Sequence, residues 1–218
     1  MQVLTSPKSK HIPRATIKRL ATYVQVLERF ALDNVEIISS NPLADACGVN
    51  GSQVRKDLAY FGEFGIRGVG YQVQGLIDAI KAALGVDQEW PMVLIGVGNM
   101  AKAILNHMED SPKRGFKIRA IFDCDPFKIG EVVHKLEVHC TEDLRDIVAR
   151  TGAEIGIITT PPERAQRAAD HLMAAGITSI LNFASARIKV PEHVHVEYVD
   201  FFHHLYALAF TRGKAGAQ

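Results

Sequence analysis

The segment GVNGSQVRKDLAYFGEFGIRGVGY, residues 48–71, decides how the first half of this chain folds. Val54 and Leu58 lie at the spacing that places apolar side chains on one buried face of a helix. Asn50 stands where that helix needs an N-cap, and Gln53 follows three residues later, as in a capping box. Four glycines in the second half break any helix and permit the positive φ values of a tight hairpin. The segment therefore predicts a helix followed by a hairpin.

Two further helices are expected before this segment. Apolar residues recur at the period of a helix over 13–30, and a second, short helix is predicted to end at Cys47-Gly48. Asn41 is expected to cap that second helix, with Pro42 at its first position. A short helix, a turn containing glycine and another helix form the pattern of a helix-turn-helix.

Polar and basic side chains of the third helix and the hairpin are candidates for contact with DNA. Arginine and glutamine can read base edges in the major groove, whereas lysine and hydroxyl side chains more often hold phosphates. An arginine among glycines suits insertion into a narrow minor groove. The predicted DNA-binding residues are Ser52, Gln53, Arg55, Lys56, Tyr60, Arg67 and Gly68. On these residues alone, a solvated, charged helix face followed by a loose turn fits equally well.

The pattern changes from residue 91 onward to alternating strands and helices. Short strands are expected at 92–95, 117–122, 154–159, 177–183 and 194–199, with helices between them and a last helix over 201–210. Repeated strand–helix units are typical of a parallel, doubly wound sheet. A helix over 76–84 and a candidate boundary at 85–88 precede this half. The chain is predicted to be an α/β protein with an N-terminal winged helix-turn-helix domain (1–85) and a C-terminal Rossmann-like doubly wound parallel sheet (86–200). A C-terminal helix and tail (201–218) follow, and the broad apolar face of this helix suits either packing within one chain or dimerisation.

A glycine motif, GVGNMA at residues 96–101, follows the first of these strands and opens the next helix. The first glycine of such a motif makes a tight turn, the second lets the backbone approach a pyrophosphate, and the small third residue lets helix and strand pack closely. The helix N-terminus supplies N–H groups and a partial positive charge to the phosphates. A dinucleotide site is predicted, but a tight turn that binds nothing and a site for another nucleotide, such as coenzyme A, remain open.

Asp123, at the end of the next strand, is placed to accept a hydrogen bond from a ribose 2′-hydroxyl and to repel a 2′-phosphate. The chain therefore favours NADH and NAD+ over NADP(H). Lys128 is either an ordinary surface lysine or a cover for the adenine ribose. The carboxyl ends of the later strands should complete the crevice. The predicted cofactor-binding residues are Gly96, Val97, Gly98, Asn99, Met100, Ala101, Asp123, Lys128, Thr160, Pro161, Asn182 and Phe183.

The composition fits an ordinary globular protein, with 47% hydrophobic and 22% charged residues and a net charge of +1. Residues 1–75 hold nine Lys and Arg against six Asp and Glu, which is compatible with phosphate binding. No apolar run approaches the roughly eighteen residues of a membrane span, so no membrane partner is expected. The three scattered cysteines are expected to be reduced, which indicates a cytoplasmic location. The nine histidines show no zinc spacing, and no metal site is predicted.

A catalytic NAD-dependent dehydrogenase is the rival class of protein. Hydride transfer to a substrate normally needs a placed acid or base beside the nicotinamide. His203 and His204 lie near the crevice in the sequence, but they belong to an apolar helix without a recognisable motif. The helix-turn-helix also leaves no part of the chain for a separate substrate domain. No catalytic residue is predicted, and the chain is not expected to be an enzyme.

With both halves described, the sequence closely resembles the redox-sensing transcriptional repressor family Rex. The resemblance runs from Ile12 to about Phe210 and rests on five blocks in a shared order. The blocks are VNGSQVRKDLAYFGEFGIRGVGY, GVGNMA, FDCDPFKIG, AGITSILNFA and the Asp200-Phe201 start of the last helix. The resemblance implies a homodimer of winged-helix and Rossmann subunits that exchange their C-terminal helices. It also implies binding to pseudo-palindromic, double-stranded operator DNA when NAD+ is high, and release when NADH rises.

Two departures from the family pattern bear on the switch between these states. Members of the family often carry an arginine where this chain has Gln25 and a tyrosine where it has His107. In the family, that arginine pairs with the acid that matches Asp200 in one redox state. This pairing does not carry over unchanged, and Asp200 is left to pair with another group, His107 included. His107, Asp200 and Phe201 are therefore the candidate switch and dimer residues.

Overall fold

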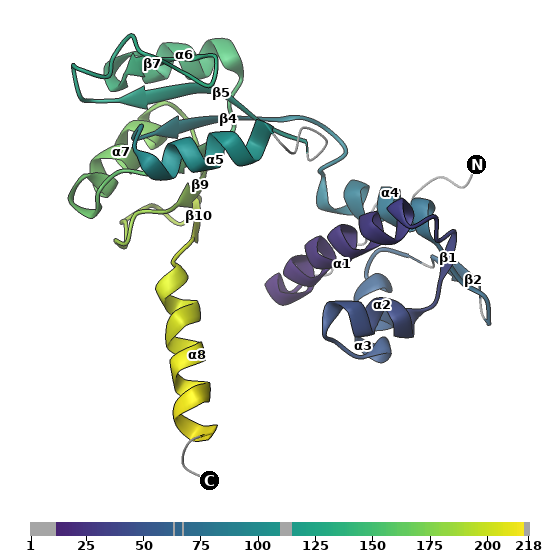
Figure 1. Cartoon of the computed structure of the whole chain (residues 1–218). Helices are drawn as coiled ribbons and strands as arrows, with labels where there is room; N and C mark the ends of the chain where they lie inside the picture. Colours follow the sequence, from purple (N-terminus) through teal and green to yellow (C-terminus); the bar gives the residue numbers. More distant parts are fainter. Residues whose placement is uncertain (1–11, 63, 67, 110–114, 216–218) are drawn as a thin grey trace. The chain divides into compact units, whose positions relative to one another are not determined.

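The computed structural model describes residues 12–62, 64–66, 68–109 and 115–215 (Figure 1). The chain divides between Gln88 and Glu89 into two compact units. Each unit has its own buried hydrophobic residues, so the two are described separately.

The first unit consists of four helices and three short strands around one core. Its elements are α1 (Arg14–Leu32), β1 (Ile37–Ile38), α2 (Ser40–Cys47), α3 (Gly51–Leu58), β2 (Gly65–Ile66), β3 (Gly70–Gln72) and α4 (Val73–Leu84). Helix α1 packs against α2 and α4, and α2 packs against α3. The strands pair antiparallel in the order β1-β3-β2. Helix α3 is thus followed by a hairpin that pairs back onto the strand between α1 and α2.

Two helix starts in this unit test the capping predictions. Asn50 caps α3 as predicted, because its side chain accepts a hydrogen bond from the Gln53 N–H at 2.8 Å. The predicted cap at Asn41 is wrong, because α2 begins at Ser40, after Ser39 at the N-cap position. Pro42 therefore lies at the third helical position, where its missing N–H removes no hydrogen bond of the helix.

The second unit contains a seven-stranded sheet in the order β10-β9-β8-β4-β5-β7-β6, in which all neighbours run parallel except β6 and β7. Its strands are β4 (Trp90–Ile95), β5 (Phe116–Asp123), β6 (Val132–Val133), β7 (Leu136–Cys140), β8 (Ile155–Ile158), β9 (Ser179–Asn182) and β10 (His195–Tyr198). Its α-helices are α5 (Asn99–Glu109), α6 (Leu144–Thr151), α7 (Ala165–Ala174) and α8 (Phe201–Ala215), with short 3-10 turns η2 (Thr141–Asp143) and η3 (Pro162–Arg164) before α6 and α7.

Helices cover both faces of this sheet because strand side chains alternate between the faces. Met92 and Leu94 of β4 share a core with buried residues of α5. Val93 and Ile95 of the same strand share a second core with buried residues of α6 and α7. This arrangement confirms the predicted Rossmann-like parallel sheet.

Strands β6 and β7 are not predicted from the sequence. His134 and Lys135 connect them at φ values of 50° and 65°. This left-handed region favours glycine, so two residues with side chains give no turn signal there. The omission matters because β7 lies beside β5 and leads directly into Thr141, which lines the cavity described below.

A buried carboxylate ties α3 to α1 in the first unit. Asp57 of α3 is 1% exposed. Its donors are Arg19 Nε (2.6 Å) and Nη2 (2.8 Å), Tyr23 OH (2.8 Å), Gln53 Nε2 (2.9 Å) and Thr16 Oγ1 (3.2 Å). All of these side chains except Gln53 belong to α1. One carboxylate therefore holds α3 in one orientation on α1.

These contacts keep Asp57 charged. Burial by itself would raise the pKa of this carboxyl, but hydrogen bonds from Arg19, Tyr23 and Gln53 outweigh burial and hold the pKa below its ordinary value. The hydrogen bond to Asp57 raises the pKa of the Arg19 guanidinium, and burial together with the bond to Asp57 raises the pKa of Tyr23. Tyr23 therefore remains a neutral donor to an ionised acceptor.

Asp57→Asn is expected to lower the free energy of unfolding by about 3 kcal/mol, near the lower end for breaking a buried ion pair, because Arg19 is 29% exposed and regains water. A depressed folded pKa contributes stability above the unfolded pKa of about 3.9, and that contribution is lost as pH falls through the folded pKa. The difference between wild type and variant should therefore be constant near neutral pH and shrink below about pH 4. Urea unfolding at several pH values measures it.

Asp45→Asn is the matched control, because Asp45 is an exposed aspartate on α2. Its effect is expected to stay within about 0.5 kcal/mol. An equal effect of the two substitutions, or a difference at Asp57 that grows in acid, would contradict the proposed role of the buried carboxylate.

Candidate functional site

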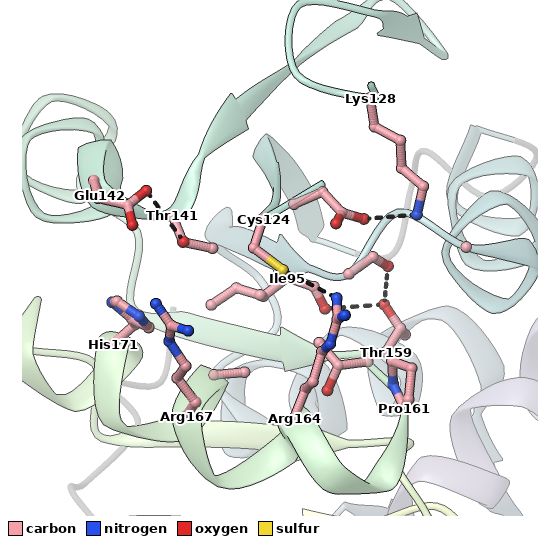
Figure 2. A pocket seen from close by; sticks show the side chains of 15 residues that line it. Ile95, Cys124, Lys128, Thr141, Glu142, Thr159, Pro161, Arg164, Arg167 and His171 are labelled. Carbon is pink, nitrogen blue, oxygen red and sulfur yellow. Dashed lines mark hydrogen bonds and ion pairs between the residues drawn. The ribbon is translucent and has the colours of Figure 1, made fainter. Parts of the chain in front are cut away.

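A cavity of about 670 Å³ opens at the carboxyl ends of β4, β5 and β8 (Figure 2). The chain leaves β4 toward β5 on one side, and β8 lies on the other side, so this is the point where the strand order reverses. Ligands of open α/β sheets bind at this point. The lining residues are Ile95, Gly96, Gly98, Asp123, Cys124, Lys128, Thr141, Glu142, Thr159, Thr160, Pro161, Arg164, Arg167, Ala168 and His171.

The two glycines of the GVGNMA motif differ in what surrounds them. Gly96 has a φ of +101°, and a Cβ there would lie 2.8 Å from the Thr160 backbone nitrogen and 2.9 Å from the Thr159 carbonyl carbon. The Gly96 carbonyl also accepts a hydrogen bond from Thr159 Oγ1 at 2.7 Å. A Cβ at Gly98 would meet no atom within 4 Å. The fold itself therefore requires the first glycine, whereas the second leaves open space of the kind a bound phosphate needs.

Asp123 holds this loop from the side of β5. The carboxylate is 6% exposed, and its Oδ2 accepts hydrogen bonds from the Val97 N–H at 2.8 Å and Lys128 Nζ at 3.0 Å. Its Oδ1 accepts one from the Asp125 N–H at 3.0 Å. Burial would raise the pKa of Asp123, but these hydrogen bonds hold it below its ordinary value. An ionised carboxylate oxygen has two lone pairs, so Oδ1 keeps acceptor capacity for a ribose hydroxyl.

Lys128 is therefore not an isolated surface lysine. It pairs with Asp123 and is about one-third exposed at the edge of the cavity. The pair partly compensates the negative charge that was predicted to exclude a 2′-phosphate.

The structure brings together six of the predicted cofactor-binding residues, which line the cavity; they are Gly96, Gly98, Asp123, Lys128, Thr160 and Pro161. Thr160 Oγ1 is buried and has no hydrogen-bond partner within the described part of the chain. A buried hydroxyl without a partner is costly, and it suits a polar group of a ligand.

The other six do not line the cavity. Val97 and Ala101 are buried in the core beside the loop, and Met100 is 43% exposed. Asn99 begins α5. The Asn182 amide is used within the fold, because it donates to the Ala186 carbonyl and accepts from the Ala184 N–H. Phe183 packs against the core on the α5 side of the sheet.

Nine lining residues are not among the predicted cofactor-binding residues. Besides Ile95, Thr159 and Ala168, they are Cys124, Thr141, Glu142, Arg164, Arg167 and His171. Three of them follow β8 at positions 164, 167 and 171, a spacing that places side chains on one face of a helix. Polar residues at helical spacing, directly after a strand that ends at the crevice, are a signal from which these three residues could have been predicted. Thr141 and Glu142 follow the unpredicted strand β7 and left no such signal.

The predicted DNA-binding residues lie on α3, just after it, and in the following turn. Ser52, Arg55 and Lys56 are exposed, and the Arg55 Nη1 donates to Ser40 Oγ of α2 at 2.7 Å. Gln53 and Tyr60 are half-buried, and Gln53 Nε2 donates to Asp57 Oδ1 at 2.9 Å.

Two more predicted DNA-binding residues, Arg67 and Gly68, fall between β2 and β3 in the sequence. Gly68 is exposed with a φ of +84°, a conformation that favours glycine. Arg67 lies outside the residues that the structure describes.

The predicted switch residues have these surroundings. His107 is exposed on α5. Asp200 Oδ1 accepts a hydrogen bond from the Phe202 N–H at 2.9 Å, and Oδ2 lies 3.4 Å from His203 Nδ1. Phe201 is 59% exposed and stacks on Phe202, with ring centroids 4.4 Å apart. Asp200 thus finds its partners in the first turn of α8, the helix that it precedes.

Within the described residues no group of three His, Cys, Asp or Glu side chains is arranged to hold a metal ion. In the same part of the chain, every helix is too short or too polar to cross a membrane.

Family models and solved structures agree with the two-unit architecture. A model described as "Putative DNA-binding protein N-terminus" matches residues 11–59, and one described as "CoA binding domain" matches residues 87–186. The structure is similar to RSP, a Rex-family repressor, in complex with beta-NAD+ and operator DNA, at 35% identity and a TM-score of 0.88 over 96% of each chain. It is also similar to RSP in complex with beta-NADH, at 33% identity and 0.85, over 96% of this chain and 98% of that one.

Curated relatives cover nearly the whole chain. The "Redox-sensing transcriptional repressor Rex" of Maridesulfovibrio salexigens is 63% identical over 94% of this chain and 97% of its own length. That of Streptomyces coelicolor is 42% identical over 97% of this chain and 82% of its own. The protein is thus of the class that joins an N-terminal DNA-binding domain to a Rossmann-like parallel sheet. Within that class, the chain belongs to the redox-sensing transcriptional repressor family Rex.

Gly96→Ala is expected to lower the free energy of unfolding by about 3 kcal/mol, because a side chain there is strained and meets backbone atoms. Gly98→Ala, with open space around it, is the matched control and should change stability by about 0.5 kcal/mol or less. Urea unfolding compares the two variants. Equal effects would mean that the loop shifts freely and that the close contact at Gly96 is not a constraint.

Proposed function

We propose that this chain is a transcriptional repressor that senses the NADH/NAD+ ratio, binding operator DNA when NAD+ is high and leaving it when NADH rises. The observation that carries the proposal is the likeness, over 96% of this chain, to a repressor solved with NAD+ and operator DNA and again with NADH. The curated relatives are named as repressors, so the alternative of an NAD-dependent oxidoreductase is not favoured. The repressor acts in the cytoplasm in this proposal.

The unit assigned to DNA is residues 1–85, and its proposed form is a winged helix. Support comes from the order of elements, in which α3 is followed by a hairpin that pairs with β1. Helix α3 enters the major groove, and the β2–β3 turn reaches the adjacent minor groove. Arg55 and Lys56 are the exposed basic contacts of α3, with Ser52 beside them at its start. On the opposite face of α3, the hydrogen bonds of Asp57 hold this helix on α1 and so fix the direction in which these side chains point.

The unit assigned to NAD(H) is residues 86–200. The proposed pose places the pyrophosphate at the Gly96–Gly98 loop and the start of α5, and an adenosine ribose hydroxyl at Asp123 Oδ1. The nicotinamide half then lies toward β8, where Thr160 Oγ1 offers an unused polar group. These residues only bind and orient the dinucleotide, since repression requires no chemical step.

Residues 201–218 are proposed to join two copies into a homodimer by exchange of α8. The support is the exposure of its apolar side chains, among them Leu205 (47%), Tyr206 (70%), Leu208 (66%) and Phe210 (65%). So much exposed apolar surface on one helix marks an interaction site. A second copy of the chain has the matching symmetry, because two recognition helices then meet a pseudo-palindromic operator.

The proposed switch couples the two units through the dimer. NADH and NAD+ compete for one crevice but bind two arrangements of the dimer unequally, and DNA binds only one of them well. Linkage makes this reciprocal, so operator DNA weakens NADH binding by the factor by which NADH weakens DNA binding. Each tenfold change needs about 1.4 kcal/mol of differential affinity. This chain has Gln25 where the family often has the arginine that pairs with the acid matching Asp200. In the proposed switch, His203 replaces that arginine as the partner of Asp200.

Operator affinity is expected to fall at least tenfold as NADH replaces NAD+ at constant total dinucleotide. Gel shift with a pseudo-palindromic operator at varied ratios measures it, and a parallel hydride-transfer assay should stay blank. Gly98→Ala is the control, because its added methyl group occupies the space proposed for the pyrophosphate. This variant should bind operator with an affinity that does not change when NADH is added. If wild type bound NADH without any change in operator affinity, the sensor proposal would be contradicted.

Arg55→Ala is expected to weaken operator binding roughly tenfold, the usual cost of one lost base contact, and to leave NADH affinity unchanged. Fluorescence anisotropy with labelled operator and calorimetry with NADH measure the two affinities. Arg29→Ala removes an exposed arginine of α1 and should leave both unchanged. Loss of both affinities in Arg55→Ala would point to misfolding and away from a DNA contact.

A further inference from the structure

Arg164 lines the dinucleotide crevice and contacts a residue on its opposite side. It ends the short turn η3 after β8, and its Nη1 donates a hydrogen bond to Cys124 Sγ at 3.2 Å. Cys124 directly follows β5, so the two residues follow strands that lie on opposite sides of β4. Figure 2 shows the guanidinium reaching from Arg164 over the cavity to the cysteine sulfur.

This position corresponds to the adenosine end of the crevice. With the pyrophosphate at the glycine loop and the adenosine ribose at Asp123, the adenine base lies beyond the ribose, away from the loop. Cys124 is the residue next to Asp123, and both line the cavity. In the proposed pose, a guanidinium that touches Cys124 therefore lies next to the place of the adenine ring.

The chemistry of this contact leaves Arg164 available to a ligand. A thiol sulfur is a weak acceptor, so little is lost when the guanidinium exchanges it for another partner. Arg164 is exposed and forms no ion pair within the described residues. Lys128 is engaged by the Asp123 carboxylate at 3.0 Å, and Arg167, which also lines the cavity, lies three positions further along the chain. Arg164 is thus the lining cation that contacts Cys124, and this contact is easily replaced.

A guanidinium is planar, always charged and weakly hydrated, and it stacks on the faces of aromatic rings. We propose that Arg164 stacks on the adenine ring of the bound dinucleotide and is a determinant of its affinity. The inference rests on the proposed binding of NAD(H) in this crevice. Because NAD+ and NADH carry the same adenine, Arg164 scales both affinities by one factor. It therefore sets the concentration at which the crevice fills, and it leaves the preference between the two redox forms to the nicotinamide side.

Arg164→Ala tests this assignment by calorimetric titration with three ligands. Affinity for NADH and for NAD+ is expected to fall about fivefold each, the fold-change that corresponds to about 1 kcal/mol of cation–π attraction. Affinity for reduced nicotinamide mononucleotide, which lacks the adenosine, should not change. Arg150→Ala, an exposed arginine at the end of α6 outside the cavity, is the matched control and should bind all three ligands like wild type.

Four results would overturn the proposal. If Arg164→Ala binds NADH and NAD+ as tightly as wild type, Arg164 does not contact the dinucleotide. If the affinities for NADH and NAD+ fall by different factors, the side chain lies at the nicotinamide. A loss seen at low salt and absent at high salt indicates an ion pair with the pyrophosphate, because salt screens exposed charges. When NADPH is titrated in addition, a larger loss for NADPH than for NADH indicates contact with a 2′-phosphate. Failure of the sensor function is distinguishable, since wild type would then bind NADH without any change in operator affinity.

Discussion

The close approach of two backbone segments at Gly96 is the constraint on which the dinucleotide crevice depends. The loop after β4 passes so near the chain after β8 that a methyl group at Gly96 would lie 2.8 Å from a backbone nitrogen. The Thr159 hydroxyl bonds the Gly96 carbonyl, and the Asp123 carboxylate bonds the next N–H from the side of β5. Three strand ends are thereby joined around one turn, and the space beside Gly98 stays open.

A buried carboxylate performs the same kind of task in each unit. Asp57 holds α3 to α1, and Asp123 holds the glycine loop to β5. Both are kept ionised by hydrogen bonds that outweigh their burial, and both carry a cation partner, Arg19 or Lys128. An unpaired buried charge is costly, so each arrangement is stable only when its donors are in place. The surfaces proposed to meet DNA and the dinucleotide are therefore supported by polar contacts as well as by the apolar cores.

The parts of this protein that could be predicted are those with local signals. Helix periodicity, the Asn50 cap, the GVGNMA motif and the acid at the end of β5 all act within a few residues of the chain. The expectation that Asn41 caps α2 failed because the helix begins one residue earlier, at Ser40, and the side chain at the N-cap position, Ser39, makes no capping hydrogen bond. The β6–β7 hairpin was hidden because His134 and Lys135 adopt a conformation for which glycine is the usual signal.

The sequence by itself determined the two-domain α/β architecture, the site of the glycine loop and, through its resemblance, the family. These follow from patterns that repeat along the chain or occupy a short span. Only the tertiary structure decided which side chains share the crevice and what they bond. Arg164 meets Cys124 forty positions earlier, and Asp57 meets Arg19 thirty-eight positions earlier, because strand order and helix packing bring them together. The number of residues between two positions does not determine whether their side chains meet in space. The packing of one element on another does.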